Sequence, residues 1–165
     1  MRIGNRFDCG CTNITSTDGL SLPWVNELRY LGVFIVSSRK FKCSLDHVKR
    51  AFYCAANAWF GKVARAASEE VVLYLVKSKR YPILLYGLEA CVLNKEENRS
   101  IDFTKTRFFM KLFRTSNPQV IDDCQTFFRV ESPSVRLAKL TCKFIARYKN
   151  NDNNMCKLFS IQCEL

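Results

Sequence analysis

Apolar residues recur at steps of three and four between positions 45 and 66, and this spacing constrains the fold more than any other feature of the chain. The series consists of Leu45, Val48, Phe52, Ala55, Trp59, Val63 and Ala66. Such steps place side chains on one face of an α-helix. The opposite side carries polar and basic residues, namely Lys49, Arg50, Asn57 and Arg65. The sequence therefore predicts a helix with a buried stripe beside a basic, polar stripe.

Capping residues predict further helices downstream. Ser68 precedes two glutamates, which is typical of a helix start, and the helix is expected to reach about Lys79. Tyr81 before Pro82 should end it, and Pro82 is expected to begin a short apolar helix through Glu89.

Three more helix starts follow. Asn94 and Glu97 form a capping-box pattern that predicts a helix over 95–114, with Ile101, Phe108 and Leu112 in the core. On that helix a basic series repeats at steps of four and three, and its members are Arg107, Lys111 and Arg114. Asn-Pro at 117–118 and Ser-Pro at 132–133 predict helices over about 118–128 and 133–149.

The N-terminal part has a different pattern. Residues 1–36 contain short β-rich runs around a Thr-Asp-Gly turn, which predict three or four antiparallel strands. The expected fold class is mainly α (α+β), with a small N-terminal antiparallel sheet or hairpin followed by a bundle of five to six helices. We expect the divisions 1–37 for the strands, 38–149 for the helices and 150–165 for a polar joint and tail.

The charge balance favours an anionic partner. Lys and Arg number 26 and Asp and Glu 15, for a net charge of +11, and residues 38–80 alone hold ten basic and three acidic groups. Nucleic acid and acidic lipid are the partners that such a surface attracts, although a solvated basic surface has the same composition. The longest apolar stretch, 83–93, is too short for a bilayer that needs about 20 residues, so no membrane association is expected.

The cysteines and the N-terminus suggest an intracellular protein, either cytoplasmic or nuclear. Nine cysteines are scattered without the pattern of a disulfide scaffold and are interpreted as free thiols. The N-terminal residues include no apolar run that could form the core of a signal peptide.

Catalytic and metal-binding patterns are weak. Cys43 and His47 lie four residues apart and could share a helix face, but a thiol beside a surface histidine is the better interpretation. The cysteine spacing does not favour zinc. Asp122 and Asp123 resemble paired metal-binding aspartates, but their helical context favours a solvated pair.

Several segments together resemble the C-terminal primer-grip and thumb region of reverse transcriptases from LINE-type (non-LTR) retrotransposons. They are LRYLGVFI at 28–35, NAWFGKVARAASEEVVLYLVKSK at 57–79, LLYGLEAC at 84–91 and FFMKLFRT at 108–115. The resemblance covers roughly residues 20–130 and implies a polymerase thumb preceded by palm-edge strands.

The resemblance also implies roles for individual residues. Tyr30, Leu31 and Gly32 would form the primer grip, although Leu31 as sheet core and Gly32 as a bulge or packing site is an equal alternative. The basic residues expected to contact phosphates are Lys49, Arg50, Lys62 and Arg65, with Arg107, Lys111 and Arg114 as either further contacts or a solvated face.

The family's catalytic block, an aromatic and a small residue followed by two aspartates, is not found in this sequence. The parent family uses Mg²⁺ at such aspartates, so we expect no cofactor, no catalytic residues and no DNA synthesis by this chain. The predicted function is non-catalytic binding of an RNA/DNA or RNA duplex. The alternatives are a protein-interaction or self-associating remnant without nucleic-acid binding, and part of an RNA-directed DNA polymerase whose catalytic part is missing from this chain. Besides nucleic acid, the expected partners are a second copy of this chain or a longer polymerase chain.

Overall fold

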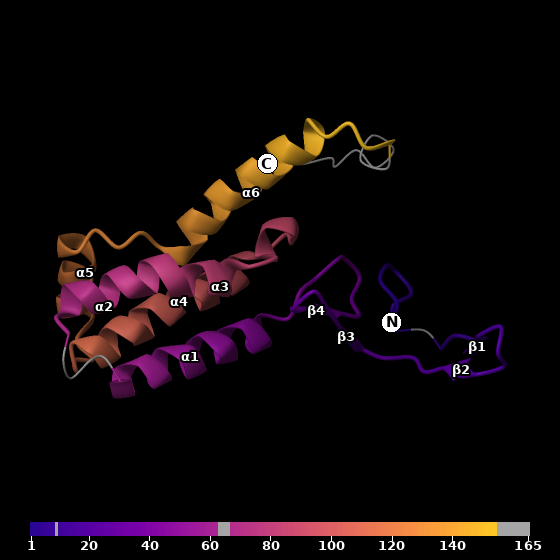
Figure 1. Cartoon of the computed structure of the whole chain (residues 1–165), viewed down its shortest axis with the longest axis horizontal. Coiled ribbons are helices and arrows are strands. Elements are labelled where there is room, and N and C mark those ends of the chain that lie inside the picture. The colour runs from indigo at the N-terminus through magenta and orange to yellow at the C-terminus, as the bar shows by residue number, and fades with distance from the viewer. Residues whose placement is uncertain (9, 63–66, 155–165) are drawn as a thin grey trace. The chain divides into compact units, whose positions relative to one another are not determined.

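The computed structural model describes residues 1–8, 10–62 and 67–154. The fold is mainly helical, with two small antiparallel hairpins at the N-terminus, as the sequence predicted (Figure 1). The chain divides into two units, Met1–Glu97 and Asn98–Leu165. The sequence divisions at residues 37 and 149 stay predictions.

Two hairpins begin the first unit. The first pairs β1 (Ile14–Thr15) with β2 (Ser21–Leu22), and the second pairs β3 (Glu27–Tyr30) with β4 (Val33–Val36). In the second hairpin Tyr30 is paired with Val33, so only two residues form the turn. A two-residue turn brings the strands together tightly and projects its own side chains into solvent.

Helix α1 (Leu45–Lys62) buries only part of the predicted stripe: Phe52 is buried, whereas Leu45, Val48, Ala55 and Trp59 are half-buried, and Ala56 is buried although it was not predicted. Phe52 is 1% exposed and Ala56 5% exposed, one turn apart on the same face. The helix packs against α3 (Tyr81–Leu85) and against the π-helical turn η1 (Val76–Arg80). Residues 63–66, which include the predicted Val63, Arg65 and Ala66, lie outside the described residues.

The predicted break at Tyr81 and Pro82 is wrong. Helix α2 (Glu69–Leu75) begins after Ser68 as expected, but it continues through η1 directly into α3. The amide of Tyr81 donates to the carbonyl of Val76, five residues earlier. This wider turn changes the hydrogen-bond register immediately before Pro82, whose nitrogen has no hydrogen to donate. The packing of the buried Tyr81 and Leu84 therefore outweighs the local tendency of Pro82 to end the helix.

The helix α3 ends at Leu85, before the predicted Glu89, and a turn at Gly87 leads into the 3-10 helix η2 (Leu88–Ala90). Gly87 has a φ of 75°, and a Cβ atom built on it would lie 2.4 Å from Cγ2 of Val33. Only glycine fits this position without a clash, because the β3–β4 hairpin approaches the backbone here. Gly87 thus sets where the hairpin sits within the first unit.

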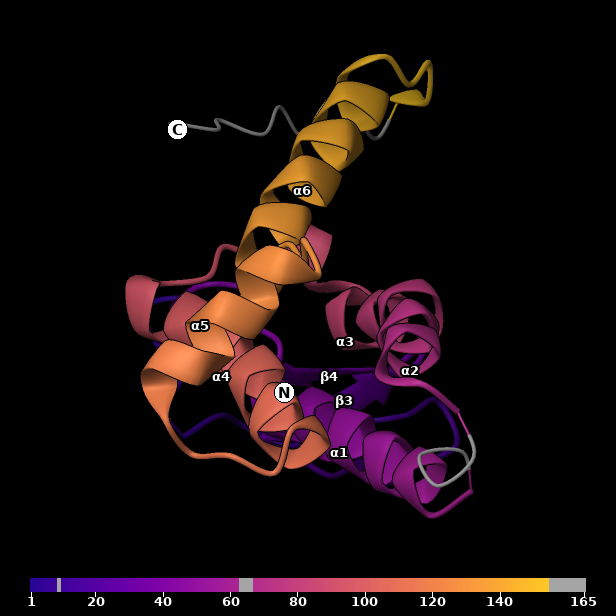
Figure 2. The same ribbon diagram turned by 90° about the vertical axis from the view of Figure 1, so that its left-hand side faces the viewer.

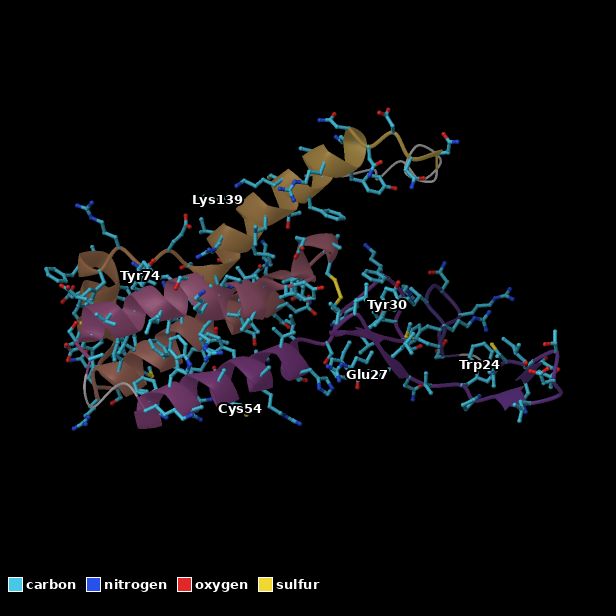
Figure 3. All side chains as sticks on the ribbon, viewed as in Figure 1. Trp24, Glu27, Tyr30, Cys54, Tyr74 and Lys139 are labelled. Carbon is cyan, nitrogen blue, oxygen red and sulfur yellow. A yellow bond between two sulfur atoms is a disulfide. The ribbon has the colours of Figure 1, made fainter. Side chains whose placement is uncertain are left out.

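The interpretation of the cysteines as free thiols is wrong for two of them. Cys43, 1% exposed, forms a disulfide with Cys91, 7% exposed, which Figure 3 shows as a yellow bond. The bond links the β4–α1 connection to the end of η2 across 48 positions, and sequence spacing does not reveal such a pairing. Among the described residues Cys54, Cys124 and Cys142 carry free thiols. The cysteines therefore no longer support the expected intracellular location, since disulfides are rare in reducing compartments.

Helix α4 (Lys95–Leu112) begins with the predicted capping box. The amide of Glu97 donates to Oδ1 of Asn94 at 2.7 Å, and the amide of Asn94 donates to Oε2 of Glu97 at 2.9 Å. Burial raises the pKa of Glu97, but hydrogen bonds from Lys42 and from the Asn94 amide, with the charge of Lys42, outweigh it and hold that pKa below its usual value. The capping box thus includes a charged contact within the first unit.

The second unit is built around α4, α5 (Pro118–Phe127) and α6 (Pro133–Lys149), close to the predicted ranges. Its core includes Ile101 at 0% and Phe108 at 5% exposure, as predicted, whereas Leu112 is half-buried. Helix α4 ends at Leu112 instead of Arg114. The amide of Thr115 donates to the carbonyl of Met110 around Arg114, whose φ is 52°, which is the hydrogen-bond pattern of a Schellman cap.

Within the described residues, none of the helices combines the length and apolar character that crossing a bilayer requires.

Candidate functional site

The Tyr30-Leu31-Gly32 segment forms the exposed tip of the β3–β4 hairpin. Leu31 and Gly32 are the two central residues of the turn, with φ of 47° and 84°. Positive φ at both positions is the requirement of a type I′ turn. Glycine adopts this conformation freely, whereas for leucine it costs about 1–2 kcal/mol. The hairpin thus holds a strained leucine at its tip.

The side chains of this tip point into solvent. Tyr30 is 61% exposed and Leu31 72% exposed (Tyr30 is labelled in Figure 3). The alternative interpretation of Leu31 as sheet core is therefore wrong. Gly32 is neither a bulge nor a tight packing site, because a Cβ atom there would meet only Cε1 of Tyr86, at an ordinary 3.9 Å. Of the three tip residues, Gly32 alone lines a concave surface, and because it has no side chain it leaves the backbone accessible there.

This concave surface is a cavity of about 510 Å³ in the first unit, and sequence reasoning missed it. Its walls are formed by the β3–β4 hairpin, by α1, and by α3 together with the residue that follows it. Its lining consists of Arg29, Gly32, Phe34, His47, Val48, Ala51, Pro82, Ile83 and Tyr86. Because these residues come from three separate parts of the sequence, no local spacing could have predicted that they meet.

Polar and aromatic groups of the cavity are held by the hairpin. Arg29 and Phe34 are cross-strand partners, and the Arg29 guanidinium lies 5.6 Å from the centre of the Phe34 ring. The His47 ring also stacks on the Phe34 ring, with 3.8 Å between the two ring centres and 7° between the two ring planes. Nε2 of His47 lies 3.2 Å from Oε2 of Glu27. A cationic group and aromatic faces in one hollow can contact a phosphate and a planar ring together.

The Cys43–His47 pairing considered from the sequence is not a nucleophilic site. Cys43 is bonded to Cys91, so it offers no thiol to the imidazole. His47 instead contacts Glu27 and Phe34. Its place in the structure is on the wall of the cavity.

The predicted basic residues of α1 do not form one narrow stripe. Lys49 is a quarter exposed and contacts Asp46 at 3.1 Å, while Arg50 and Lys62 are exposed. At about 100° per residue, Arg50 lies about 100° and Lys62 about 220° around the helix from Lys49. These three cations therefore surround the exposed part of the helix, and Arg65 lies outside the described residues.

The other predicted cations belong to the second unit. Arg107 and Lys111 are exposed one turn apart on α4, which keeps them on the same face. Arg114 is also exposed, but it lies past the helix end in the left-handed cap and leaves that row. Of the three predicted cations, Arg107 and Lys111 therefore share a helix face, and Arg114 does not.

Asp122 and Asp123 are both exposed on α5, as the interpretation of a solvated pair expected. Among residues 1–8, 10–62 and 67–154, no three His, Cys, Asp or Glu side chains converge as metal ligands do. The donors of this pair do not fit a two-metal polymerase site, which needs a third carboxylate.

No protein-family model, curated protein or solved structure matches the chain.

Proposed function

We propose that this chain binds the sugar-phosphate backbone of an RNA/DNA or RNA duplex without catalysing its synthesis, in the manner of the primer-grip and thumb region of a LINE-type reverse transcriptase. The observation that carries the proposal is the tip of the β3–β4 hairpin. Leu31 is exposed and strained at once, and neither property helps the chain to fold. Strained backbone concentrates where a ligand is held, which supports a binding role for this tip.

The surroundings of the tip support the same role. Gly32 leaves the backbone open to a close approach, and the adjacent cavity is lined by Tyr86 and by Arg29, whose guanidinium lies over the Phe34 ring. The net charge of +11 favours a polyanion over a neutral ligand. A backbone-tracking module of this kind has weak sequence preference, because contacts to phosphate and sugar do not read bases.

Replacing Leu31 by asparagine tests the proposal. Asn-Gly is the preferred pair for a type I′ turn, so Leu31→Asn should stabilise the hairpin by about 1 kcal/mol. The same change removes the apolar tip, so affinity for a fluorescein-labelled RNA/DNA hybrid should fall severalfold. Fluorescence anisotropy measures the affinity and urea unfolding the stability.

Leu20→Asn is the matched control. Leu20 is 68% exposed beside the β1–β2 turn, so this variant also removes an exposed leucine next to a hairpin. It should leave the affinity for the hybrid unchanged. Equal affinities for the wild type and Leu31→Asn, or equal losses in both variants, would exclude the tip as a contact. No binding of the hybrid by the wild type would exclude the function itself.

Self-association is the second candidate, and an exposed apolar surface on α2 favours it. Val71 and Tyr74 are 48% and 69% exposed and lie three residues apart on one face (Tyr74 is labelled in Figure 3). Light scattering distinguishes the two functions. A stable dimer that Tyr74→Lys converts to a monomer, together with no affinity for the hybrid, would favour this candidate over the first.

A further inference from the structure

Helix α6 carries a one-sided charge that the predicted site residues do not include. Its 17 residues contain five Lys or Arg and no Asp or Glu. Four of these cations follow one another at steps of three, four and four, namely Arg136, Lys139, Lys143 and Arg147. At about 100° per residue these four fall within an arc of about 80°. We refer to them as the α6 stripe.

The helix is held at its first turn and extends from there. Asp102 of α4 accepts hydrogen bonds from the amide of Ser134 at 2.9 Å and from its hydroxyl at 2.7 Å, and so caps α6. The Lys105 ammonium donates to Oγ of Ser132 at 3.0 Å. Among the side chains of α6, only Pro133 and Leu137 are buried. Figure 2 shows the rest of α6 extending away from α4 and α5.

The α6 stripe is accessible along this extended part. Lys139, Lys143 and Arg147 are exposed, whereas Arg136, at the start of the stripe, is half-buried; Lys139 is labelled in Figure 3. Lys139 contacts Glu131, and both side chains are largely in solvent. An exposed ion pair of this kind contributes little stability, so a phosphate can compete with the carboxylate for the lysine.

The spacing of the α6 stripe fits a phosphate backbone. From Arg136 to Arg147 the helix rises about 16 Å, at about 1.5 Å per residue. One strand of double-stranded DNA presents a phosphate about every 3.4 Å along its axis, and the A-form geometry of a hybrid brings phosphates closer, so this length covers at least about five nucleotides. Four cations over this length can each contact a phosphate without any of them reading a base.

The apolar side of the helix does not fit a lipid surface equally well. A helix that lies on a membrane inserts an exposed apolar face between headgroups. Phe144 and Tyr148 are only half-exposed, and their rings contact each other with 6.3 Å between centres. The side that carries the α6 stripe is thus more exposed than the side that carries these two rings, which favours a polyanion over a bilayer.

We propose that the α6 stripe is a second polyanion-binding site, which holds the sugar-phosphate backbone of one nucleic-acid strand through four phosphate contacts. The proposal rests on the proposed function for its ligand, but it uses a different helix from the hairpin and from α1. Four duplex contacts should contribute about 3.6 to the slope of log affinity against log salt. Between about 50 and 200 mM salt they therefore account for about a 10²-fold loss of affinity.

The test compares the wild type with a variant of the full chain that neutralises all four cations, Arg136→Gln/Lys139→Gln/Lys143→Gln/Arg147→Gln. Glutamine keeps a high helix propensity, and circular dichroism checks that the helix content is retained. The probe is a fluorescein-labelled RNA/DNA hybrid of about 20 base pairs, longer than the stretch that the helix covers. We expect the salt slope to fall by about 3 to 4.

Lys143→Gln and Lys149→Gln form a matched pair that remains informative if the fourfold variant loses helix. Both remove one lysine from α6, but Lys149 lies about 120° away from the middle of the stripe. Lys143→Gln should lower the slope by about 1 and Lys149→Gln should leave it unchanged. Equal effects of the two would overturn the stripe as a site.

Three other results of these binding experiments also distinguish this inference from the proposed function. An unchanged slope in the fourfold variant, with hybrid binding retained, would overturn this inference and leave the proposed function standing. No binding of the hybrid by the wild type would overturn both. Binding of the wild type to phosphatidylserine vesicles, lost in the fourfold variant while its hybrid affinity is unchanged, would assign the stripe to a membrane surface instead.

Discussion

Replacing Gly87 by alanine should destabilise the first unit by more than the backbone conformation alone explains. Its φ of 75° costs an L-residue about 1–2 kcal/mol, of which about 0.4–1 kcal/mol is offset by the reduced freedom of the unfolded chain. The new Cβ would lie 2.4 Å from Cγ2 of Val33, and such overpacking costs about 1–3 kcal/mol. The expected total is about 3 kcal/mol.

Gly32→Ala is the control, because it isolates the backbone cost. Gly32 has a φ of 84°, but its added Cβ would meet only Tyr86, at 3.9 Å. We therefore expect this variant to lose about 1 kcal/mol or less. Urea unfolding followed by circular dichroism gives both values. The difference between the two variants, about 2 kcal/mol, is the cost of the contact with Val33.

Removing the clashing atoms should restore stability. In the Gly87→Ala background, Val33→Ala deletes both methyl groups of Val33, so the two changes together should cost less than the sum of their separate effects. Because the contact positions the hairpin, the same double variant should also recover affinity for the hybrid. Equal losses in Gly87→Ala and Gly32→Ala, or strictly additive effects with Val33→Ala, would refute the reasoning.

Two further predictions concern the first unit. Reduction of the Cys43–Cys91 disulfide should lower the free energy of unfolding by up to about 4 kcal/mol, because the bond closes a loop of 48 residues. Cys54→Ser, which removes a free thiol, should have little effect. Urea unfolding with and without a phosphine reductant measures both effects. Because the pKa of Glu97 is lowered in the fold, its contribution to stability is present above its unfolded pKa and lost as the pH falls through the folded one. Glu97→Gln should reduce this acid-induced loss of stability. If the free energy of unfolding depends on pH in the same way in this variant and in the wild type, the contact of Glu97 with Lys42 does not have this role.

Local signals predicted most helix starts correctly because the groups that decide them are neighbours in sequence. Asn94 and Glu97 satisfy each other's amides, and Asn117 accepts from the amide of Gln119 at the start of α5. Pro133 opens α6 for a similar reason, since the first turn needs no donor from it. The capping bonds of α4 and α5 are complete within a few residues, whereas the first turn of α6 is capped by Asp102 of α4, which sequence spacing does not reveal.

Pro82 and Cys43 show where local reasoning stops. A proline normally ends a helix, but the π-helical turn before Pro82 shifts the hydrogen-bond register, and buried neighbours keep the chain helical. Cys43 pairs with Cys91 only because the fold brings the β4–α1 connection beside η2. Both outcomes depend on contacts between distant segments, which neither composition nor spacing records.

The two candidate surfaces differ in what the sequence could reveal. The cavity beside Gly32 joins three separate segments, so no sequence pattern contains it. The α6 stripe is the opposite case, because its steps of three, four and four are visible in the sequence, although the sequence-based predictions named cations of α1 and of the α4 region instead. The structure adds that the cations of α1 surround the exposed part of their helix, whereas four of the five cations of α6 share one face.

The α6 stripe is charged and the tip of the hairpin is not, so their contributions to binding can be measured separately. Phosphate contacts from the α6 stripe release counterions, so their loss changes the salt slope. Leu31 carries no charge, so its loss should lower affinity by the same factor at every salt concentration and leave the slope unchanged. The double variant Leu31→Asn/Lys143→Gln should therefore show the lower salt slope of Lys143→Gln and the lower affinity of Leu31→Asn. A change of slope caused by Leu31→Asn alone would mean that the hairpin acts through the placement of cations, and not by direct contact with the ligand.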